Sequence, residues 1–311
     1  MEVVPVAFDS MGVRSEATLV KVGAMKIFFD PGVALAPKRF GLSPSKTELK
    51  ALELAKELVM ELAEKCKIVV VTHYHYDHHP YPEDDEMYER CFSGKLVLCK
   101  HISKEINRSG RERGRLFFDK VSTLAKEVVF ADGEDFVLKK VKLRFSPAVW
   151  HGDVGSKVGK VIMAAVEEEE RFVFGSDAQS LADPKAKEWF IETKPNAAVI
   201  DGYPTLFLGW RFAKEKFEAA KRNLIEALGS TPLRCVILDH HLVRDPNYKE
   251  KLKEVFGACR KVKILTAAEY LDLPNLFLES WRRELVKGTR TVDVEAYYAE
   301  LRTKIMKKIK R

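Results

Sequence analysis

Five side chains that can bind a metal ion stand close together in one short run of the sequence. The run reads His-Tyr-His-Tyr-Asp-His-His and offers His73, His75, Asp77, His78 and His79. Neutral imidazole and carboxylate are ligands that zinc and similar divalent metals accept. Without a ligand, several polar rings crowded at the end of a buried strand would be costly. The run therefore predicts a metal site, and its density allows one loop to serve two ions.

The elements before this run place it at the end of a strand. Residues 68–71 read Ile-Val-Val-Val, and their length and β-branching are typical of a strand buried on both faces. A Ser45-x-x-Glu48 capping box predicts an amphipathic helix over 45–65. Its apolar positions are Leu49, Leu52, Ala55, Leu58, Val59 and Leu62. Because α/β sheets form ligand sites at the carboxyl ends of their strands, a metal site suits this position.

Four more expected strand ends carry candidate side chains. They are Asp30, His151, Asp177 and the pair His240 and His241. Taken alone, Asp30 before Pro31-Gly32 could equally begin a turn, and His151 could be a structural histidine. Asp177 is the stronger candidate, because a two-metal site needs an anionic bridge to offset its charge.

The order of these motifs resembles that of the metallo-β-lactamase superfamily. His73-x-His75-x-Asp77-His78 is similar to its HxHxDH motif, and the later aspartates and histidines follow in the same order. More narrowly, residues 9–15, 73–79 and 239–245 are similar to an uncharacterised archaeal family within it. The resemblance implies an α/β fold, a four-layered αββα sandwich in which the equipped strand ends converge.

The chain is expected to form one domain over residues 1–311. An insertion is expected at about 81–127 and a helical C-terminal cap at about 275–311, with no internal repeat or low-complexity linker. Strands are further expected over 128–145, as a hairpin of 161–166 with 171–174, and over 197–200 and 235–238, with a helix over 212–228.

The resemblance also implies a role for each candidate. Two metal ions would be held by seven residues: His73, His75 and His151 for one ion, Asp77, His78 and His240 for the other, and Asp177 as the bridge. Asp30 would support the histidine loop by hydrogen bonding. His241 is the alternative to His240. The spacing from His240 to Arg244 resembles that of transfer-RNA 3′-processing nucleases, which favours His240.

Such a site would perform hydrolysis. Two divalent ions roughly 3.5 to 4 Å apart lower the pKa of a bound water towards 7 and stabilise the oxyanion that forms. Zinc is the first expectation, with manganese or iron as alternatives. Asp77 would orient the nucleophile, and His79 and His241 are candidates for the leaving-group acid. Histidine at position 75 favours the hydrolases, because the redox di-iron members resemble HxExDH there.

The expected substrate is an anionic ester, with a phosphodiester as the first choice. The chain carries a net charge of +7, and the expected insertion holds four arginines. These are Arg108, Arg111, Arg113 and Arg115, which could bind phosphate or simply keep a helix solvated. A small anionic ester and a nucleic acid remain alternatives, the latter implying an RNA- or DNA-processing nuclease. A non-catalytic metal- or ligand-binding protein is disfavoured by the complete ligand set.

The remaining composition indicates a cytoplasmic protein with no membrane partner. No stretch approaches 18 uncharged apolar residues, and the N-terminus lacks the pattern of a signal sequence. Five scattered cysteines without a CxxC argue against a disulfide framework. The single glutamine among abundant lysine and glutamate predicts a heat-adapted source. The sequence indicates no oligomeric state.

Overall fold

The structure, a computed structural model, describes residues 1–310 and divides into two compact units. Unit 1 comprises Met1–Cys99, Glu112–Val129 and Ala267–Arg311, and unit 2 comprises Lys100–Arg111 and Phe130–Thr266. Unit 2 is therefore inserted in the sequence of unit 1. The expectation of one domain with an insertion and a C-terminal cap stays a prediction.

Unit 1 contains a six-stranded sheet in the order β1-β2-β3-β4-β5-β6. Its strands are β1 (Glu2–Phe8), β2 (Glu16–Val22), β3 (Met25–Phe29), β4 (Ile68–Val71), β5 (Leu96–Cys99) and β6 (Glu127–Phe130). The chain enters through the antiparallel strands β1 to β3, and β3, β4 and β5 then run parallel. All four residues of β4 are buried, which confirms the strand predicted before the histidine run.

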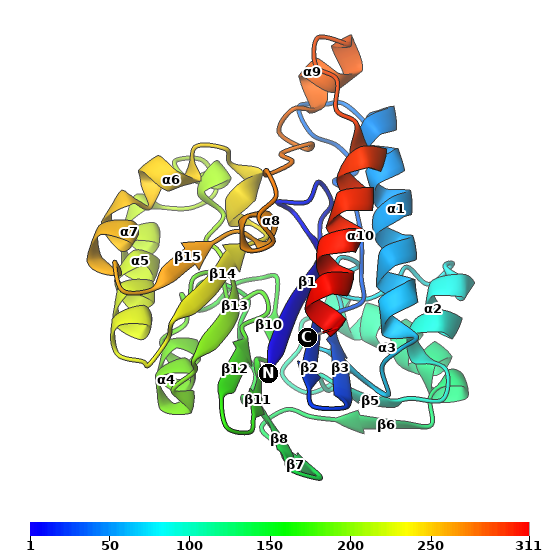
Figure 1. The fold of residues 1–311 in the computed structure, drawn as a ribbon. Helices are drawn as coiled ribbons and strands as arrows, with labels where there is room; N and C mark the ends of the chain where they lie inside the picture. Colours follow the sequence, from blue (N-terminus) through cyan, green and yellow to red (C-terminus); the bar gives the residue numbers. More distant parts are fainter. Residues whose placement is uncertain (311) are drawn as a thin grey trace. The chain divides into compact units, whose positions relative to one another are not determined.

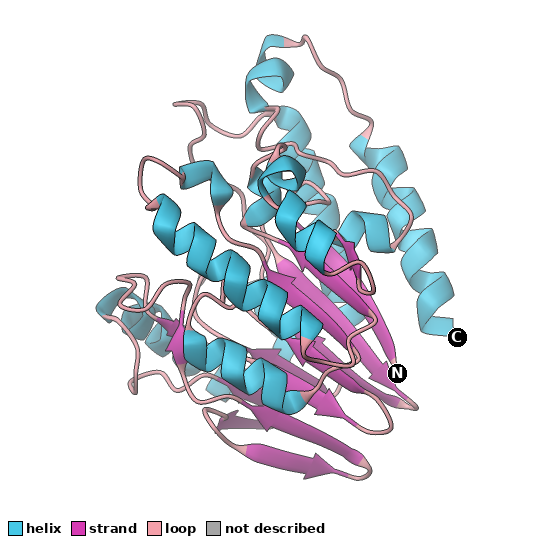
Figure 2. Cartoon of the chain, turned by 90° about the vertical axis from the view of Figure 1, so that its left-hand side faces the viewer, coloured by secondary structure: helices cyan, strands magenta, loops and turns pink. Residues whose placement is uncertain are grey.

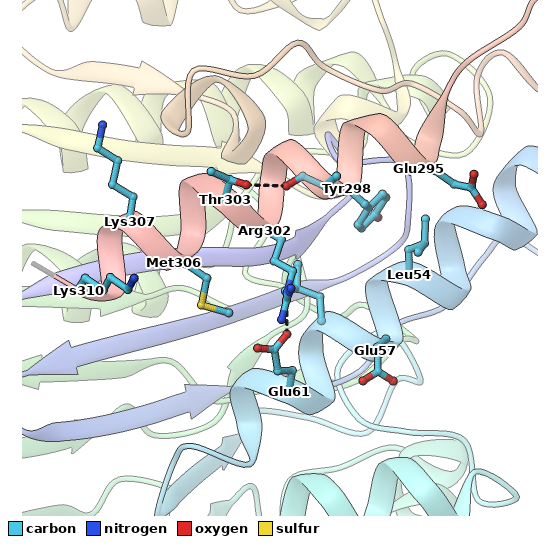
Figure 3. A pocket seen from close by; sticks show the side chains of 12 residues that line it. Leu54, Glu57, Glu61, Glu295, Tyr298, Arg302, Thr303, Met306, Lys307 and Lys310 are labelled. Carbon is cyan, nitrogen blue, oxygen red and sulfur yellow. Dashed lines mark hydrogen bonds and ion pairs between the residues drawn. The ribbon is translucent and has the colours of Figure 1, made fainter.

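Two long helices of unit 1, α1 (Lys46–Ala63) and α10 (Val294–Lys310), pack against each other and against β1 (Figure 1). The other helices of unit 1 are α2 (Asp85–Phe92), α8 (Ala267–Tyr270) and α9 (Arg282–Lys287). Helix α3 (Arg108–Leu124) begins in unit 2 and continues into unit 1 from Glu112 onward. Between α1 and α10 lies a groove of about 820 Å³, beside which Arg302 Nε donates to Glu61 Oε2 over 3.0 Å (Figure 3). None of its described lining residues is a candidate metal ligand.

The start of α1 shows the predicted capping box. Ser45 Oγ accepts from the backbone of Glu48, and the Glu48 carboxylate accepts from the backbone of Ser45. Glu48 is fully buried and forms an ion pair with Arg282. Arg282 Nη2 donates to Glu48 Oε1 over 2.7 Å, and Arg282 Nε donates to the same oxygen over 3.0 Å. Leu49, expected on the apolar face, is instead 52% exposed. In the first turn of α1 it is Glu48 that points inward, towards Arg282, and Leu49 points to solvent.

Unit 2 contains a seven-stranded sheet in the order β15-β14-β13-β12-β11-β8-β7. Its strands are β7 (Asp135–Leu138), β8 (Val141–Phe145), β11 (Ala164–Glu167), β12 (Arg171–Phe174), β13 (Ala197–Asp201), β14 (Cys235–Asp239) and β15 (Lys263–Leu265). A separate two-stranded ladder joins β9 (Val149–Trp150) to β10 (Lys160–Val161). Strands β11 and β12 form the predicted hairpin, and β12 to β15 are parallel.

Helices cover the sheet of unit 2 on the face turned to the viewer in Figure 2. They are α4 (Pro184–Thr193), α5 (Lys214–Gly229), α6 (Tyr248–Lys251) and α7 (Lys253–Ala258), with 3₁₀ turns η1 (Thr205–Phe207) and η2 (Leu242–Arg244). Helix α5 confirms the helix expected over 212–228. None of the helices between residues 1 and 310 combines the length and apolar composition needed to cross a membrane.

The parallel strands explain where the candidate residues gather. In unit 1, Asp30 follows β3 and His73 closely follows its parallel neighbour β4. In unit 2, Asp177 and His240 follow β12 and β14, which flank β13. Neighbouring parallel strands end at the same edge of a sheet, so each unit collects its own group of candidates at one edge.

The buried Glu48–Arg282 pair should contribute strongly to the stability of unit 1. Arg282→Ala leaves a buried carboxylate without its cation, so we expect the free energy of unfolding to fall by about 3 to 5 kcal/mol. Denaturant unfolding followed by circular dichroism measures this. The control is Arg290→Ala, which removes an exposed pair with Glu284 and should cost less than about 1 kcal/mol. Equal losses in both variants would contradict the prediction.

Candidate metal centre

In unit 1, the carboxylate of Asp30 organises the start of the histidine run. It is fully buried and accepts hydrogen bonds from Thr72 N at 2.8 Å and Thr72 Oγ1 at 2.5 Å. Its Oδ2 also lies 2.7 Å from His78 Nδ1, with both side chains buried. An Nδ1–H donated to Asp30 leaves the Nε2 lone pair of His78 for a metal. This arrangement matches the supporting role expected for Asp30.

The imidazoles of unit 1 converge. His73 Nε2 lies 3.0 Å from His75 Nδ1, and the ring centroids of His73 and His78 are 4.1 Å apart. Asp30, His73 and His78 offer ligand atoms within 4.8 Å of one another. The facing nitrogens of His73 and His75 can share a hydrogen bond or, when a cation is present, both bind it. Unit 1 therefore contains a group of side chains that could hold a metal ion.

The loop itself is a compact turn held by backbone contacts. His78 N donates to His75 O over 2.9 Å, and the half-buried Asp77 lies within this turn. A side chain at Gly32 could not be accommodated, because its Cβ would lie 2.2 Å from His79 N. Gly32 follows Asp30 closely, so the aspartate segment and the histidine loop can approach each other only with glycine at this position.

His79 points into an aromatic cluster. Its ring centroid lies 5.3 Å from Phe117 and 5.9 Å from Tyr74, and its Nδ1 is 3.4 Å from Tyr88 Oη. Burial lowers the pKa of His79 to about 3, so its imidazole is neutral at pH 7. A neutral, buried ring is poorly suited to protonate a leaving group. This placement favours a packing role for His79.

The four arginines of residues 108–115 fall into two groups. Arg113 is half-buried: its Nε donates to Tyr74 O over 2.5 Å, and its Cζ lies 5.8 Å from the Tyr76 ring centroid. It thus braces the histidine loop. Arg108, Arg111 and Arg115 are exposed on α3, and Arg111 also reaches Ser103 O at 3.4 Å. No contact that defines a phosphate site is seen among these side chains.

In unit 2, the Asp177 carboxylate lies between two imidazoles. Its Oδ2 is 2.8 Å from His151 Nε2, and its Oδ1 is 3.5 Å from His240 Nε2. All three side chains are buried. Each carboxylate oxygen therefore faces a different histidine, as expected of a carboxylate that bridges two cations. These three predicted ligands are brought together within unit 2.

His241 has a carboxylate partner that the sequence analysis missed. Its Nδ1 lies 2.8 Å from Asp201 Oδ2, and its backbone N donates to Asp201 Oδ1 over 2.9 Å. Asp177, His240 and His241 offer ligand atoms within 4.8 Å of one another. Asp201 ends β13, so the only signal in the sequence was an aspartate at the end of an expected strand. The pair repeats the Asp30–His78 arrangement of unit 1.

The surroundings of the two adjacent histidines differ. Arg244 Nη2 lies 3.3 Å from His240 Nε2 and 3.5 Å from its Nδ1. Burial, with the nearby charges of Arg244 and His240, lowers the pKa of His241 well below its usual value. A neutral His241 that donates Nδ1–H to Asp201 offers a lone pair at Nε2. In this state His241 could hold a metal through Nε2 and is a poor proton donor.

Several residues at these strand ends adopt left-handed backbone conformations. Asp30 has φ 47°, Ser176 has φ 50° and His240 has φ 59°. Non-glycine residues rarely adopt this conformation, and where they do it costs free energy that the surrounding structure must offset. Each of these residues is a candidate ligand or support, or directly precedes one. These three left-handed residues therefore stand at strand ends that carry groups able to hold a metal.

Solved structures of low sequence identity share the fold. Unliganded yeast PDE1 aligns with a TM-score of 0.51 at 14% identity over 85% of this chain and 96% of its own. An isothiocyanate hydrolase from Delia radicum gut bacteria aligns with a TM-score of 0.50 at 13% identity, covering 85% and 95%. The metallo-β-lactamase fold protein YhfI from Bacillus subtilis aligns with a TM-score of 0.50 at 12% identity over the same shares. The predicted metallo-β-lactamase fold is confirmed.

Relatives of high sequence identity come from thermophilic archaea. A UPF0282 protein of Thermococcus gammatolerans is 42% identical over 95% of this chain and 98% of its own length. Others in Pyrococcus horikoshii and Methanopyrus kandleri are each 38% identical over 95% and 92% of this chain, and 96% and 99% of their own. No family model matches the sequence. On the strength of these relatives, the chain belongs to the UPF0282 family.

Proposed function

We propose that the protein is a metal-dependent hydrolase with a dinuclear metal centre. The observation that carries the proposal is the Asp177 carboxylate, whose two oxygens face His151 and His240 separately. A carboxylate placed in this way can bridge two cations. The other ligands that we propose are His73, His75, Asp77 and His78.

The donor set fits divalent metals. Neutral imidazoles and carboxylates are accepted by zinc, and also by manganese and iron. Two carboxylates, Asp30 and Asp201, hold the Nδ1 atoms of His78 and His241, which fixes the tautomer in which Nε2 can coordinate. On this ground we add His241 as a ligand beside His240. Zinc is our first choice of metal.

The residues of the chain would divide the work of hydrolysis. Two bound divalent ions would supply an activated water at neutral pH and a place for the oxyanion that forms. The Asp77 carboxylate would accept a hydrogen bond from that water and orient it towards the substrate. His79 and His241 are neutral, so neither would donate a proton to the leaving group at pH 7. That proton would have to come from another group.

For the substrate we propose an anionic ester, and a phosphodiester in the first place. The net charge of +7 and the exposed Arg108, Arg111 and Arg115 support an anionic partner. A nuclease acting on RNA or DNA is the alternative within the same chemistry. The solved structures of the same fold include one named as a hydrolase. We place the activity in the cytoplasm, where buried thiols such as Cys66 and Cys91 stay reduced.

Removing the bridging carboxylate should disrupt the metal centre. In Asp177→Ala, two cations would repel each other without their shared anion, so we expect at least one metal ion per chain to be lost. Elemental analysis measures the metal content, and circular dichroism verifies the fold. Asp135→Ala is the control, because this exposed carboxylate pairs with Lys142 and Arg144 of its own sheet and is not a proposed ligand. Two metal ions per chain in Asp177→Ala would disprove the bridge.

The Asp201–His241 pair should tune metal affinity. Asp201→Asn removes the acceptor that fixes the His241 tautomer, so we expect the metal affinity to fall by about 10- to 100-fold. Competition with a chromogenic chelator measures the dissociation constant. The control, Asp132→Asn, changes a carboxylate that bonds Lys100 and the backbone of His101. If both variants bind metal like the unmodified protein, His241 is not a ligand.

Turnover separates a hydrolase from a binding protein. The metal-loaded protein should cleave bis(4-nitrophenyl) phosphate, and a chelator should abolish the release of 4-nitrophenol until metal is restored. Absorbance at the wavelength of 4-nitrophenolate follows the reaction. Absence of metal-dependent turnover across phosphodiester, thioester and lactam substrates, with ligand binding retained, would support the non-catalytic alternative instead.

A further inference from the structure

A short segment of unit 2, residues 205–212, presents an exposed indole beside a guanidinium. We call it the aromatic loop. Trp210 is 72% exposed, and Arg211 Cζ lies 4.4 Å from its ring centroid. Phe207 lies 5.9 Å from Trp210 between centroids, and 5.4 Å from Arg211 Cζ. An aromatic plane and a cation therefore stand together on an exposed turn.

The backbone of the aromatic loop is closed on itself. Three amides, from Trp210, Arg211 and Phe212, donate to Phe207 O over 2.9 to 3.2 Å. Gly209 N donates to Phe212 O over 3.1 Å, and Gly209 has φ +78°, which glycine adopts without strain. The indole is thus carried on an ordered turn, and less entropy is lost when such a surface binds a ligand.

Buried polar contacts anchor the aromatic loop to the segment that carries His240 and His241. Thr205 Oγ1 donates to Asp245 Oδ2 over 2.7 Å, and both residues are buried. Lys251 Nζ donates to the same carboxylate oxygen over 2.6 Å and to Thr205 O over 3.1 Å. Asp245 directly follows η2, which begins one residue after His241.

A second anchor reaches the segment that carries His151. The Tyr203 ring packs against Phe212 at 5.6 Å between centroids, and Tyr203 Oη donates to Asp153 Oδ2 over 3.1 Å. Asp153 lies two residues after His151. The aromatic loop also begins four residues after Asp201, the carboxylate partner of His241. The aromatic loop is therefore tied to the segments that carry His151 and His240, and it closely follows Asp201 in the sequence.

We propose that Trp210 and Arg211 form a recognition element for the substrate of this site, and that the substrate carries a planar aromatic ring close to its phosphate. The proposal rests on the proposed hydrolase function and narrows its substrate class. An exposed indole stacks on planar rings whatever their substituents, and a guanidinium pairs with phosphate oxygens. A nucleotide and an aryl phosphate share this chemistry.

Product-like monophosphates test the proposal by binding alone. Isothermal titration calorimetry of the metal-loaded protein compares adenosine 5′-monophosphate and phenyl phosphate with ribose 5-phosphate, which lacks the ring. We expect the aromatic ligands to bind about 5- to 100-fold more tightly. Tighter binding of the adenosine ligand would identify a nucleotide substrate, and tighter binding of phenyl phosphate would identify an aryl phosphate. Equal binding of both would show that the planar ring alone is recognised.

Substitution of Trp210 tests whether its indole causes the preference for aromatic ligands. Trp210→Ala should remove the preference while leaving the affinity for ribose 5-phosphate unchanged, and Trp210→Phe should restore part of it. Phe40→Ala is the matched control, because Phe40 is another exposed ring with guanidinium groups, those of Arg39 and Arg283, 4.6 and 4.3 Å from its centroid. It should bind all three ligands like the unmodified protein.

Two results would overturn the inference: no preference in the unmodified protein, or a preference that survives in Trp210→Ala. Neither depends on turnover. A protein that binds aromatic phosphates through Trp210 but hydrolyses nothing would retain this recognition element and reject the proposed hydrolase. A protein that hydrolyses phosphodiesters without a preference for aromatic ligands would support the proposed hydrolase and reject the recognition element.

Discussion

A carboxylate that holds the Nδ1 atom of a histidine is the interaction on which the candidate centre depends. Asp30 performs this role for His78 in unit 1, and Asp201 performs it for His241 in unit 2. In both pairs the aspartate stands at or just after the end of a strand. An imidazole fixed in this way directs one lone pair in one direction, whereas a free ring samples two tautomers and several rotamers. The chemistry we propose therefore begins with these two hydrogen bonds.

Sheet topology explains why the same pairing occurs twice. In unit 1 the parallel neighbours β3 and β4 bring Asp30 beside Thr72 and the loop that follows. In unit 2 the parallel neighbours β13 and β14 place Asp201 opposite Asp239, one residue before His240. Neighbouring strands have their carboxyl ends at the same edge only when they run parallel. The left-handed residues Asp30 and His240 turn the backbone away from the strand direction at these ends.

The sequence predicts the parts of this arrangement that are local. The capping box at Ser45, the buried strand β4 and the histidine run are read from neighbouring residues, and the fold follows from motif order. Asp201 escaped prediction because its partner lies forty residues away and meets it only through strand register. For Arg113 the sequence left two roles open, phosphate binding or a solvated helix face, and its hydrogen bond to Tyr74 O is a long-range contact that neither role includes. Leu49 was misplaced because Arg282, 234 residues after Glu48, draws that glutamate inward.

The burial of Glu48 has a consequence for synthesis on the ribosome. The helix that carries this carboxylate is made early, and the whole of unit 2 is translated before the cation that neutralises it. During that interval a nascent unit 1 would bury an uncompensated charge, so its first helix cannot dock in the native way. Unit 2 has all its strands by then and can fold first. The native packing of unit 1 can therefore be completed only after unit 2 has been translated.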